Sequence, residues 1–365
     1  MSGSFIIKKA LDGNVLSADE IAQLFSAPLF SSEAAEIQAA SRQLSERLSD
    51  GLAEVHAQIG VNIGPCPKNC AFCSFAACNS IFTERIELAV DEVIARVQGF
   101  ERDGANAIYL MATAGYPLSR FLDYGREVRR AISPATILIA NIEDLAKHDA
   151  VRLKNAGFNG IYHALRLGEG KDNTIQPEKR LATFRHAREG GLLLGTCVEP
   201  VGPEHTIAEL VEKTIINREA KPVFSGAARR ILIPGTPLAH HGMVSEARMA
   251  HFLAVVRLGV GCSIPGNCTH EPNVIGAAAG ANLLWAETGS NPRDIATDTD
   301  KGRGTSVAQC RELLSEAEWR VLTGPSHFFS HTHSPYSEAS IAKQNTQIFL
   351  NKWYDFYLRL AYLGH

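Results

Sequence analysis

Cys66-Pro67-Lys68-Asn69-Cys70-Ala71-Phe72-Cys73 places three cysteines in one short stretch at the spacing CxxxCxxC. The stretch directly follows an apolar run with Val61 and Ile63, which predicts a strand ending just before the cysteines. Thiolates this close in sequence can together bind a metal ion or an iron–sulfur cluster. The stretch therefore predicts a metal-binding loop at the end of a strand.

The number of cysteines distinguishes between kinds of metal site. A closed zinc site or a fully ligated [4Fe–4S] cluster takes four protein ligands, whereas three thiolates leave one iron open. The amine and carboxylate of S-adenosylmethionine (SAM) can chelate such an iron, and the apolar Phe72 suits packing against adenine. The alternatives are a zinc site with Cys78 as fourth ligand, and chance. We therefore expect Cys66, Cys70 and Cys73 to hold a [4Fe–4S] cluster that binds SAM.

The composition excludes several classes of protein. The 365 residues are 45% hydrophobic and 21% charged, which is typical of a soluble globular protein. A net charge of −3 gives no basic surface for nucleic acid. No apolar run approaches the roughly 20 residues of a membrane span, and the first residues lack a signal-peptide core. Eight cysteines then favour metal binding over disulfides, and we expect a cytoplasmic protein.

Residues 1–54 predict a helical N-terminal extension. Ser17 can cap a helix in which Glu20 lies three residues further on. In the next helix Ile37 and Leu44 belong to an apolar series at helical spacing. We expect this extension to pack outside the main domain.

Strands and helices alternate over residues 55–290. Apolar, β-prone runs are mostly separated by amphipathic segments, such as the one that carries Leu210 and Val211. Parallel strands with crossover helices predict an α/β fold, a (β/α)8 TIM-type barrel, and the less regular sixth to eighth units leave a partial barrel as the alternative. Barrel chemistry lies at the C-terminal ends of the strands, where the cysteine loop falls. The predicted strands are 55–63, 106–112, 136–142, 158–166, 192–199, 229–235, 260–265 and 281–286.

Residues 291–365 predict a C-terminal extension of loop and helix. The alternation stops after Thr288, and residues 289–304 are expected to form exposed loop. The last helix carries an apolar, aromatic stripe between Phe349 and Leu363, which requires a cover. Packing on the barrel and a homodimer seam are the two main alternatives for that cover.

The cysteine loop and the helical extension resemble those of radical SAM enzymes of the biotin synthase-like group. This group includes biotin synthase, methylornithine synthase, a hydrogenase maturase and tyrosine lyase. The later runs Ile231–Leu238 and Gly276–Leu284 are also similar, and the resemblance covers roughly residues 15–290. It implies that the reduced cluster cleaves SAM to a 5′-deoxyadenosyl radical, which abstracts hydrogen from a small molecule. It also implies a one-electron donor such as flavodoxin or ferredoxin.

The resemblance further implies contacts to SAM. The turn from Thr113 to Gly115 falls where the group has a small turn that receives the methionyl amine, although it departs from the usual Gly-Gly-Glu form. Arg166 and Glu169 resemble an Arg-x-Glu pair with one extra residue, and arginine suits a carboxylate. The alternatives are a pair between these two side chains and a surface role for Arg180. The predicted SAM-binding residues are Phe72, Thr113, Ala114, Gly115, Arg166, Glu169 and Arg180.

Polar residues at the predicted barrel mouth favour a small polar substrate. Each has an alternative role, because loop carboxylates are commonly solvated and a single histidine usually satisfies a hydrogen bond. The candidate substrate contacts are Asn141, Glu143, His163, Glu199, Asn267 and His270.

The sulfur-donating cluster of biotin synthase has no clear counterpart in this chain. Cys197 alone falls near one of its ligands, offset by about a residue, and a strand cysteine is more often a small buried hydrophobe. Rearrangement or bond cleavage in cofactor or amino-acid biosynthesis, as a transferase or lyase, is therefore favoured. One alternative is sulfur insertion with an unconventional cluster on Cys197, Cys262 and Cys268. Another is a non-catalytic zinc or iron–sulfur protein with a structural or sensing role.

Overall fold

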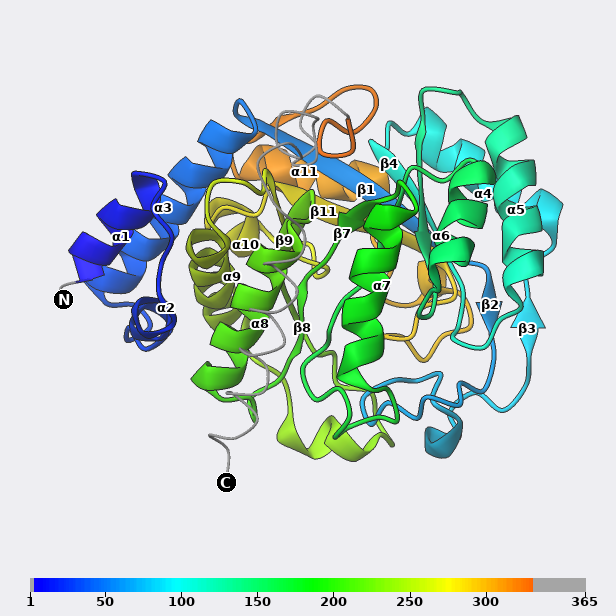
Figure 1. Ribbon diagram of the computed structural model, residues 1–365, viewed down its shortest axis with the longest axis horizontal. Helices are drawn as coiled ribbons and strands as arrows, with labels where there is room; N and C mark the ends of the chain where they lie inside the picture. The colour runs from blue at the N-terminus through cyan, green and yellow to red at the C-terminus, as the bar shows by residue number, and fades with distance from the viewer. Residues whose placement is uncertain (1–2, 331–365) are drawn as a thin grey trace.

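The strands form a closed barrel of eight parallel strands, so the predicted fold class is confirmed and the partial barrel is wrong (Figure 1). This computed structural model describes residues 3–330. The first strand pairs with the second and the last, and the remaining neighbours pair in turn until the ring closes. Around the barrel the strands are β1 (Leu52–Gly60), β4 (Ala107–Met111), β5 (Ile137–Asn141), β6 (Gly160–Tyr162), β7 (Leu193–Gly195), β9 (Phe224–Arg229), β10 (Gly266–Cys268) and β11 (Leu283–Gly289).

Two predicted strands lie elsewhere. The strand expected at 229–235 is β9, which ends at Arg229, and the strand expected at 260–265 is β10. Small residues fill β9 between Phe224 and Arg229, so its strand propensity is weak and the apolar run after it was mistaken for the strand. Val260 ends a helix that is buried along most of its length, and periodicity cannot separate such a helix from a buried strand.

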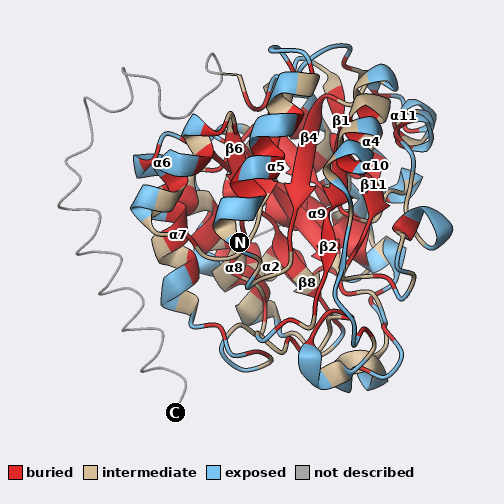
Figure 2. Cartoon of the chain, turned by 90° about the vertical axis from the view of Figure 1, so that its right-hand side faces the viewer, coloured by how far each residue is buried: buried red, intermediate tan, exposed pale blue. Residues whose placement is uncertain are grey.

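The helices of the barrel cover the outside of the strands. Figure 2 shows buried strands inside and helices whose buried faces point toward them. In α4, for example, Val93, Val97 and Phe100 are buried at helical spacing. These helices are α4 (Val90–Arg102), α5 (Leu118–Ala131), α6 (Lys147–Asn155), α7 (Pro177–Glu189), α8 (Ile207–Ala220), α9 (Glu246–Val260), α10 (Val274–Ala278) and α11 (Val307–Glu316).

No helix within residues 3–330 has the length and apolar character needed to cross a membrane. Several short strands and 3-10 turns complete the described chain. β12 pairs in parallel with the start of β1, and β8 pairs in parallel with β9. The short elements are β2 (Asn62–Ile63), β3 (Ile86–Glu87), β8 (Val198–Val201), β12 (Arg320–Val321) and the 3-10 turns η1 (Ala77–Asn79), η2 (Pro237–His241) and η3 (Thr299–Lys301).

Three helices precede the barrel and pack on its α8–α9 side (Figure 1). They are α1 (Gly3–Leu11), α2 (Ala18–Phe25) and α3 (Ser32–Leu48). The predicted cap of α2 forms, because Ser17 Oγ accepts from Glu20 N and Glu20 Oε2 accepts from Ser17 N at 2.7 Å. β1 starts at Leu52, so the expected boundary between residues 54 and 55 falls inside this strand.

Residues 326–329 close the N-terminal end of the barrel. Glu54, 1% exposed near the start of β1, accepts hydrogen bonds from His56 Nε2 at 2.8 Å and His327 N at 2.7 Å. It also accepts from Phe328 N at 3.2 Å and from the hydroxyl of Ser326. The predicted final helix and its homodimer seam lie outside the described residues.

Candidate active site

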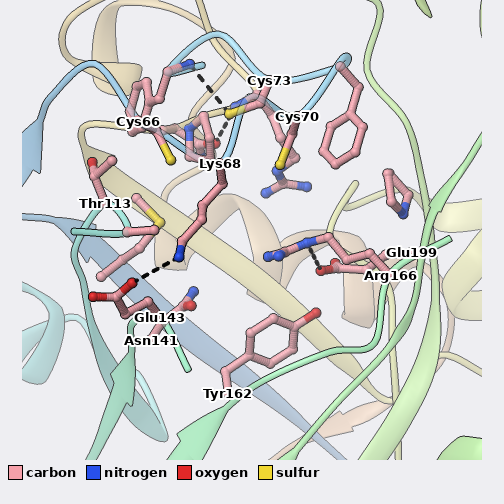
Figure 3. Close-up of a pocket in the computed structure, with 18 of the residues that line it drawn as sticks. Cys66, Lys68, Cys70, Cys73, Thr113, Asn141, Glu143, Tyr162, Arg166 and Glu199 are labelled. Atoms are coloured by element: carbon pink, nitrogen blue, oxygen red, sulfur yellow. Dashed lines mark hydrogen bonds and ion pairs between the residues drawn. The ribbon is translucent and has the colours of Figure 1, made fainter. Parts of the chain in front are cut away.

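A pocket with a cavity volume of about 180 Å³, open to solvent on one side, lies at the C-terminal ends of the barrel strands (Figure 3). Its lining comes from residues far apart in sequence, from Gln58 on β1 to Arg293 after β11. The three predicted metal ligands, Cys66, Cys70 and Cys73, all line this pocket. We call them the three loop thiols.

Local hydrogen bonds hold the cysteine loop in shape. Cys66 N donates to Phe75 O at 2.7 Å. The side-chain amide of Asn79 donates to Cys70 O at 3.2 Å and Cys73 O at 2.8 Å. Ala71 N also donates to Asp172 O at 2.8 Å, so bonds within the loop and to a distant segment position the thiols before any metal binds.

Burial controls the protonation of the three loop thiols. It raises the pKa of Cys66, and it raises that of Cys70 to about 11 and that of Cys73 to about 12. Arg166 opposes this effect at all three, because a nearby cation favours a thiolate. The thiols are therefore protonated at neutral pH in the metal-free chain, and metal binding must release their protons.

The three loop thiols do not form a compact group of metal ligands in the described chain. The sulfur ligands of one tetrahedral zinc lie about 3.8 Å apart, since each bond is about 2.3 Å. Within residues 3–330, one group of three potential metal ligands has all its ligand atoms within 4.8 Å of one another. The loop thiols do not belong to that group. Cys78, the proposed fourth zinc ligand, is exposed and does not line the pocket. Three pocket thiols without a fourth cysteine beside them among the described residues favour a cluster, in which each thiolate binds its own iron, over a closed zinc site.

The loop after β6 brings Arg166 into the pocket wall (Figure 3). Its Nε lies 3.3 Å from Glu199 Oε1. Glu169 does not pair with the Arg166 side chain. Its Oε2 accepts from Arg166 N at 2.7 Å, and its Oε1 accepts from Arg180 Nη2 at 3.1 Å. Glu169 therefore shapes this loop from behind the pocket wall, and the guanidinium of Arg166 faces the pocket beside Glu199.

A buried charged cluster supports this wall. Arg180 is 5% exposed in the first turn of α7, so it is not a surface residue, and its Nη1 lies 3.3 Å from Asp144 Oδ1. His163 Nε2 lies 3.0 Å from the same oxygen. Burial lowers the pKa of His163 to about 4, although Asp144 raises it. Burial raises the pKa of Asp144, but His163 and Arg180 outweigh that effect and lower it overall.

Replacing His163 by glutamine is expected to reduce the loss of stability between pH 6.5 and pH 4. In this window the unfolded histidine binds a proton and the folded one does not, so stability falls as the pH falls, by about 3 kcal/mol. The lowered pKa of Asp144 places its titration below this window. Urea unfolding at several pH values measures the slope, with His148→Gln as an exposed control. Equal slopes in wild type and His163→Gln would contradict the assignment.

The structure places the other predicted contacts unequally. Asn141 and Glu143 line the pocket. The side-chain amide of Asn141 donates to Gln58 Oε1 at 2.7 Å, and Glu143 pairs with Lys68 Nζ at 3.5 Å. Phe72, Thr113, Ala114, His163, Glu199 and His270 line it as well. Asn267 does not, because its buried amide donates to Gly280 O at 2.9 Å. Gly115, with a φ of +86°, is exposed and does not line the pocket.

Several pocket residues were missed from the sequence. Residues 289–304 were expected to be exposed, yet Ser290 and Asn291 are 5% and 1% exposed. Ser290 Oγ donates to Asn62 O at 2.7 Å, so the segment folds back over the barrel mouth and brings Arg293 into the pocket. Tyr162 ends β6 and could have been found as the last residue of a strand. The missed lining residues include Gln58, Lys68, Tyr162, Arg230 and Arg293.

Cys262 lies away from the pocket, so the set of Cys197, Cys262 and Cys268 is wrong as a cluster site. Its Sγ lies 3.8 Å from Ala10 O and 3.5 Å from Arg47 Nη2, both on the N-terminal helices. The error follows from the shifted strand, because Cys262 precedes β10 and Cys268 ends it.

Sequence comparison relates the chain to biotin synthases, although no family model matches it. Biotin synthase of Acidovorax ebreus is 27% identical over 221 residues, covering 57% of this chain and 61% of that protein. Biotin synthase of Thermus thermophilus is 29% identical over 187 residues, covering 49% and 56%. The chain therefore spans less than two thirds of the length of these relatives.

Structure comparison shows the same fold in two solved proteins. Methylornithine synthase (PylB) has a TM-score of 0.72 at 15% identity, over 88% of this chain and 98% of that one. HydG, a maturase of the FeFe-hydrogenase, has a TM-score of 0.77 at 16% identity. The match covers 93% of this chain and 79% of HydG. Fold and site thus define a (β/α)8 barrel protein with a three-cysteine loop at the barrel mouth. Within that class, the resemblance to the biotin synthase-like group of radical SAM enzymes is confirmed.

Proposed function

We propose that the protein is a radical SAM enzyme that acts on a small polar molecule. The observation that carries this proposal is the position of the three loop thiols. They line one pocket together with the Arg166 guanidinium, which acts on the pKa of all three thiols. Three thiols without a fourth cysteine in the described lining of the pocket fit a [4Fe–4S] cluster with one open iron, and SAM would bind in the pocket beside them.

The residues of the chain then have separate tasks. When bound, the cluster and SAM supply an electron and a 5′-deoxyadenosyl group that removes hydrogen from an unactivated carbon. Arg166 would bind the carboxylate of SAM, and Phe72 would pack on its adenine. Below the pocket, Tyr109 and Trp285 belong to a buried aromatic layer that seals the barrel against water from the other end.

The polar lining favours a small substrate with hydrogen-bonding groups. Asn141 and Gln58 present amides from neighbouring strands, and Lys68 and Glu143 add a charge of each sign. We infer a rearrangement or bond-cleavage reaction, with flavodoxin or ferredoxin as electron donor. The sulfur-inserting alternative loses support because Cys262 lies on the outside of the barrel.

Anaerobic reconstitution tests the proposal. Purified protein is incubated with iron, sulfide and a reductant, and its iron and sulfide contents are measured. About four irons per chain, and 5′-deoxyadenosine formed after addition of SAM, are the expected results. The metabolite consumed from a cell extract would then identify the substrate. Zinc in place of iron on the cysteine loop, or no cleavage of SAM, would overturn the proposal.

Replacing Arg166 by lysine is expected to weaken SAM binding and to leave the iron content unchanged. A planar guanidinium binds a carboxylate through two hydrogen bonds, and loss of this geometry costs about 1.5–3 kcal/mol, roughly ten- to a hundredfold in affinity. Equilibrium binding of SAM to the reconstituted protein measures the change. Arg126→Lys is the matched control, since Arg126 pairs with Asp123 on the surface of α5. Unchanged affinity in Arg166→Ala would remove Arg166 from the site.

A further inference from the structure

A second group of potential metal ligands lies inside the barrel, beneath the pocket. Cys197, Cys268 and His270 offer two sulfur atoms and one ring nitrogen that all lie within 4.8 Å of one another. The two cysteines are free and are 1% and 0% exposed, and His270 is 8% exposed. Among residues 3–330 no other three potential ligands lie this close together.

The barrel itself brings these residues together from distant parts of the sequence. Cys197 follows β7, Cys268 ends β10, and β9 pairs with both strands. Gly226 on β9 makes the close approach to β10 possible, because a Cβ there would lie 2.0 Å from Cys268 O. The two thiols are therefore held on either side of one strand by the closed ring.

Buried polar atoms without partners surround the group. Within the described residues, His270 Nε2, Tyr162 Oη and Trp285 Nε1 are buried and have no hydrogen-bond partner. The ring of His270 lies 5.2 Å from that of Tyr162 and 4.8 Å from that of Trp285. Unpaired buried polar groups are rare in folded proteins, and an ion or ordered water usually accounts for them.

We propose that Cys197, Cys268 and His270 bind one zinc ion directly beneath the pocket. Two thiolates and an imidazole are ligands that zinc prefers, and three protein ligands leave a fourth position for water or substrate. That position faces the pocket, since His270 lines the pocket together with Tyr162 and Glu199. The other ring nitrogen of His270, Nδ1, lies 3.9 Å from Glu199 Oε2, the kind of carboxylate that orients a metal-bound histidine.

Charge balance also favours a divalent ion with these ligands. Zn²⁺ displaces the two thiol protons of Cys197 and Cys268, so the ion, two thiolates and a neutral His270 have no net charge. A neutral centre avoids most of the cost of placing an ion in the barrel interior. Because two protons leave for each ion, binding strengthens as the pH rises.

The site goes beyond the proposed function and does not depend on the cysteine loop. Its fourth position suits a substrate atom with a lone pair, such as a carboxylate oxygen, an amine nitrogen or a sulfur. Such a ligand would hold the substrate at the floor of the pocket, across from the three loop thiols. This last step rests on the proposed function, whereas the zinc site itself does not.

Cobalt binding to a full-length Cys66→Ala/Cys70→Ala/Cys73→Ala variant tests the zinc site, because Co²⁺ replaces zinc and shows thiolate charge-transfer absorption. The variant lacks the loop ligands, so failure of the iron–sulfur proposal cannot affect the result. One Co²⁺ per chain is expected, displaced by one Zn²⁺. Adding Cys197→Ala or Cys268→Ala should abolish the absorption, and adding His270→Gln should weaken binding at least about tenfold.

Cys310→Ala is the matched control, because Cys310 is a fully buried thiol in a different part of the core. Circular dichroism verifies that each variant is folded, and His270→Gln keeps both thiols if the cysteine variants fail to fold. No thiolate absorption in the loop variant, or absorption that survives both Cys197→Ala and Cys268→Ala, would overturn the proposal.

Discussion

Replacing Cys66, Cys70 or Cys73 singly by alanine is expected to abolish both cluster reconstitution and SAM cleavage. Each thiolate binds a different iron, and no other thiol of the described chain lines the pocket to replace it. Iron content should fall from about four per chain to near zero, and 5′-deoxyadenosine should drop below detection. Anaerobic iron analysis and chromatography of the nucleoside measure the two effects.

Cys78→Ala is the control for this experiment. Cys78 lies close to the motif in sequence, but it is exposed and its Sγ contacts Asn79 Oδ1 at 3.4 Å instead of facing the pocket. The variant should keep its iron and its turnover. A Cys78→Ala protein that loses iron would show that the loop uses four ligands, and the open iron position would then be excluded.

Replacing Glu54 by alanine is expected to lower the free energy of unfolding by about 3–5 kcal/mol, because it breaks a buried charged network. His56 and Ser326 lose their acceptor, and the backbone N–H groups of His327 and Phe328 lose theirs. His56, Ser326 and Phe328 are buried, so the loss of their acceptor is costly. Urea unfolding followed by circular dichroism measures the change.

A surface carboxylate gives the comparison. Asp123 pairs with Arg126 on α5 with its side chain 70% exposed, so Asp123→Ala should cost about 0.5 kcal/mol or less. Glu54→Gln keeps the size of the side chain and one acceptor oxygen. Its loss of unfolding free energy should therefore lie between those of Asp123→Ala and Glu54→Ala. If Glu54→Ala unfolds at the wild-type urea concentration, residues 326–329 do not depend on this carboxylate.

Local patterns were predicted well from the sequence. The three cysteines and the Ser17 cap depend on residues a few positions apart, so their geometry can be read directly from the spacing. The closed barrel followed from the repeated strand–helix pattern. The prediction misplaced β9 because its small residues have a low strand propensity. Packing against the neighbouring strands holds them in the sheet, and this effect cannot be read from local sequence.

Long-range proximity was not predicted. Cys197 meets Cys268 and His270 through the closure of the barrel and the register of three strands. A one-residue change of register would turn each side chain to the other face of its strand. Arg293 was missed for a related reason, because its loop is polar in composition and is buried by its contacts with the mouth of the barrel.

The pairing of β1 with β11 has a consequence for synthesis of the chain. During synthesis β4 soon follows β1 and can pair with one of its edges. The other edge of β1 stays unpaired until residues 283–289, which form β11, have been made. A ribosome that adds roughly 5–20 residues per second needs about 10–50 s to cover that interval. For this time an apolar strand presents unpaired N–H and C=O groups to solvent. Yield of folded protein should therefore depend on translation speed and on chaperones that bind the nascent chain.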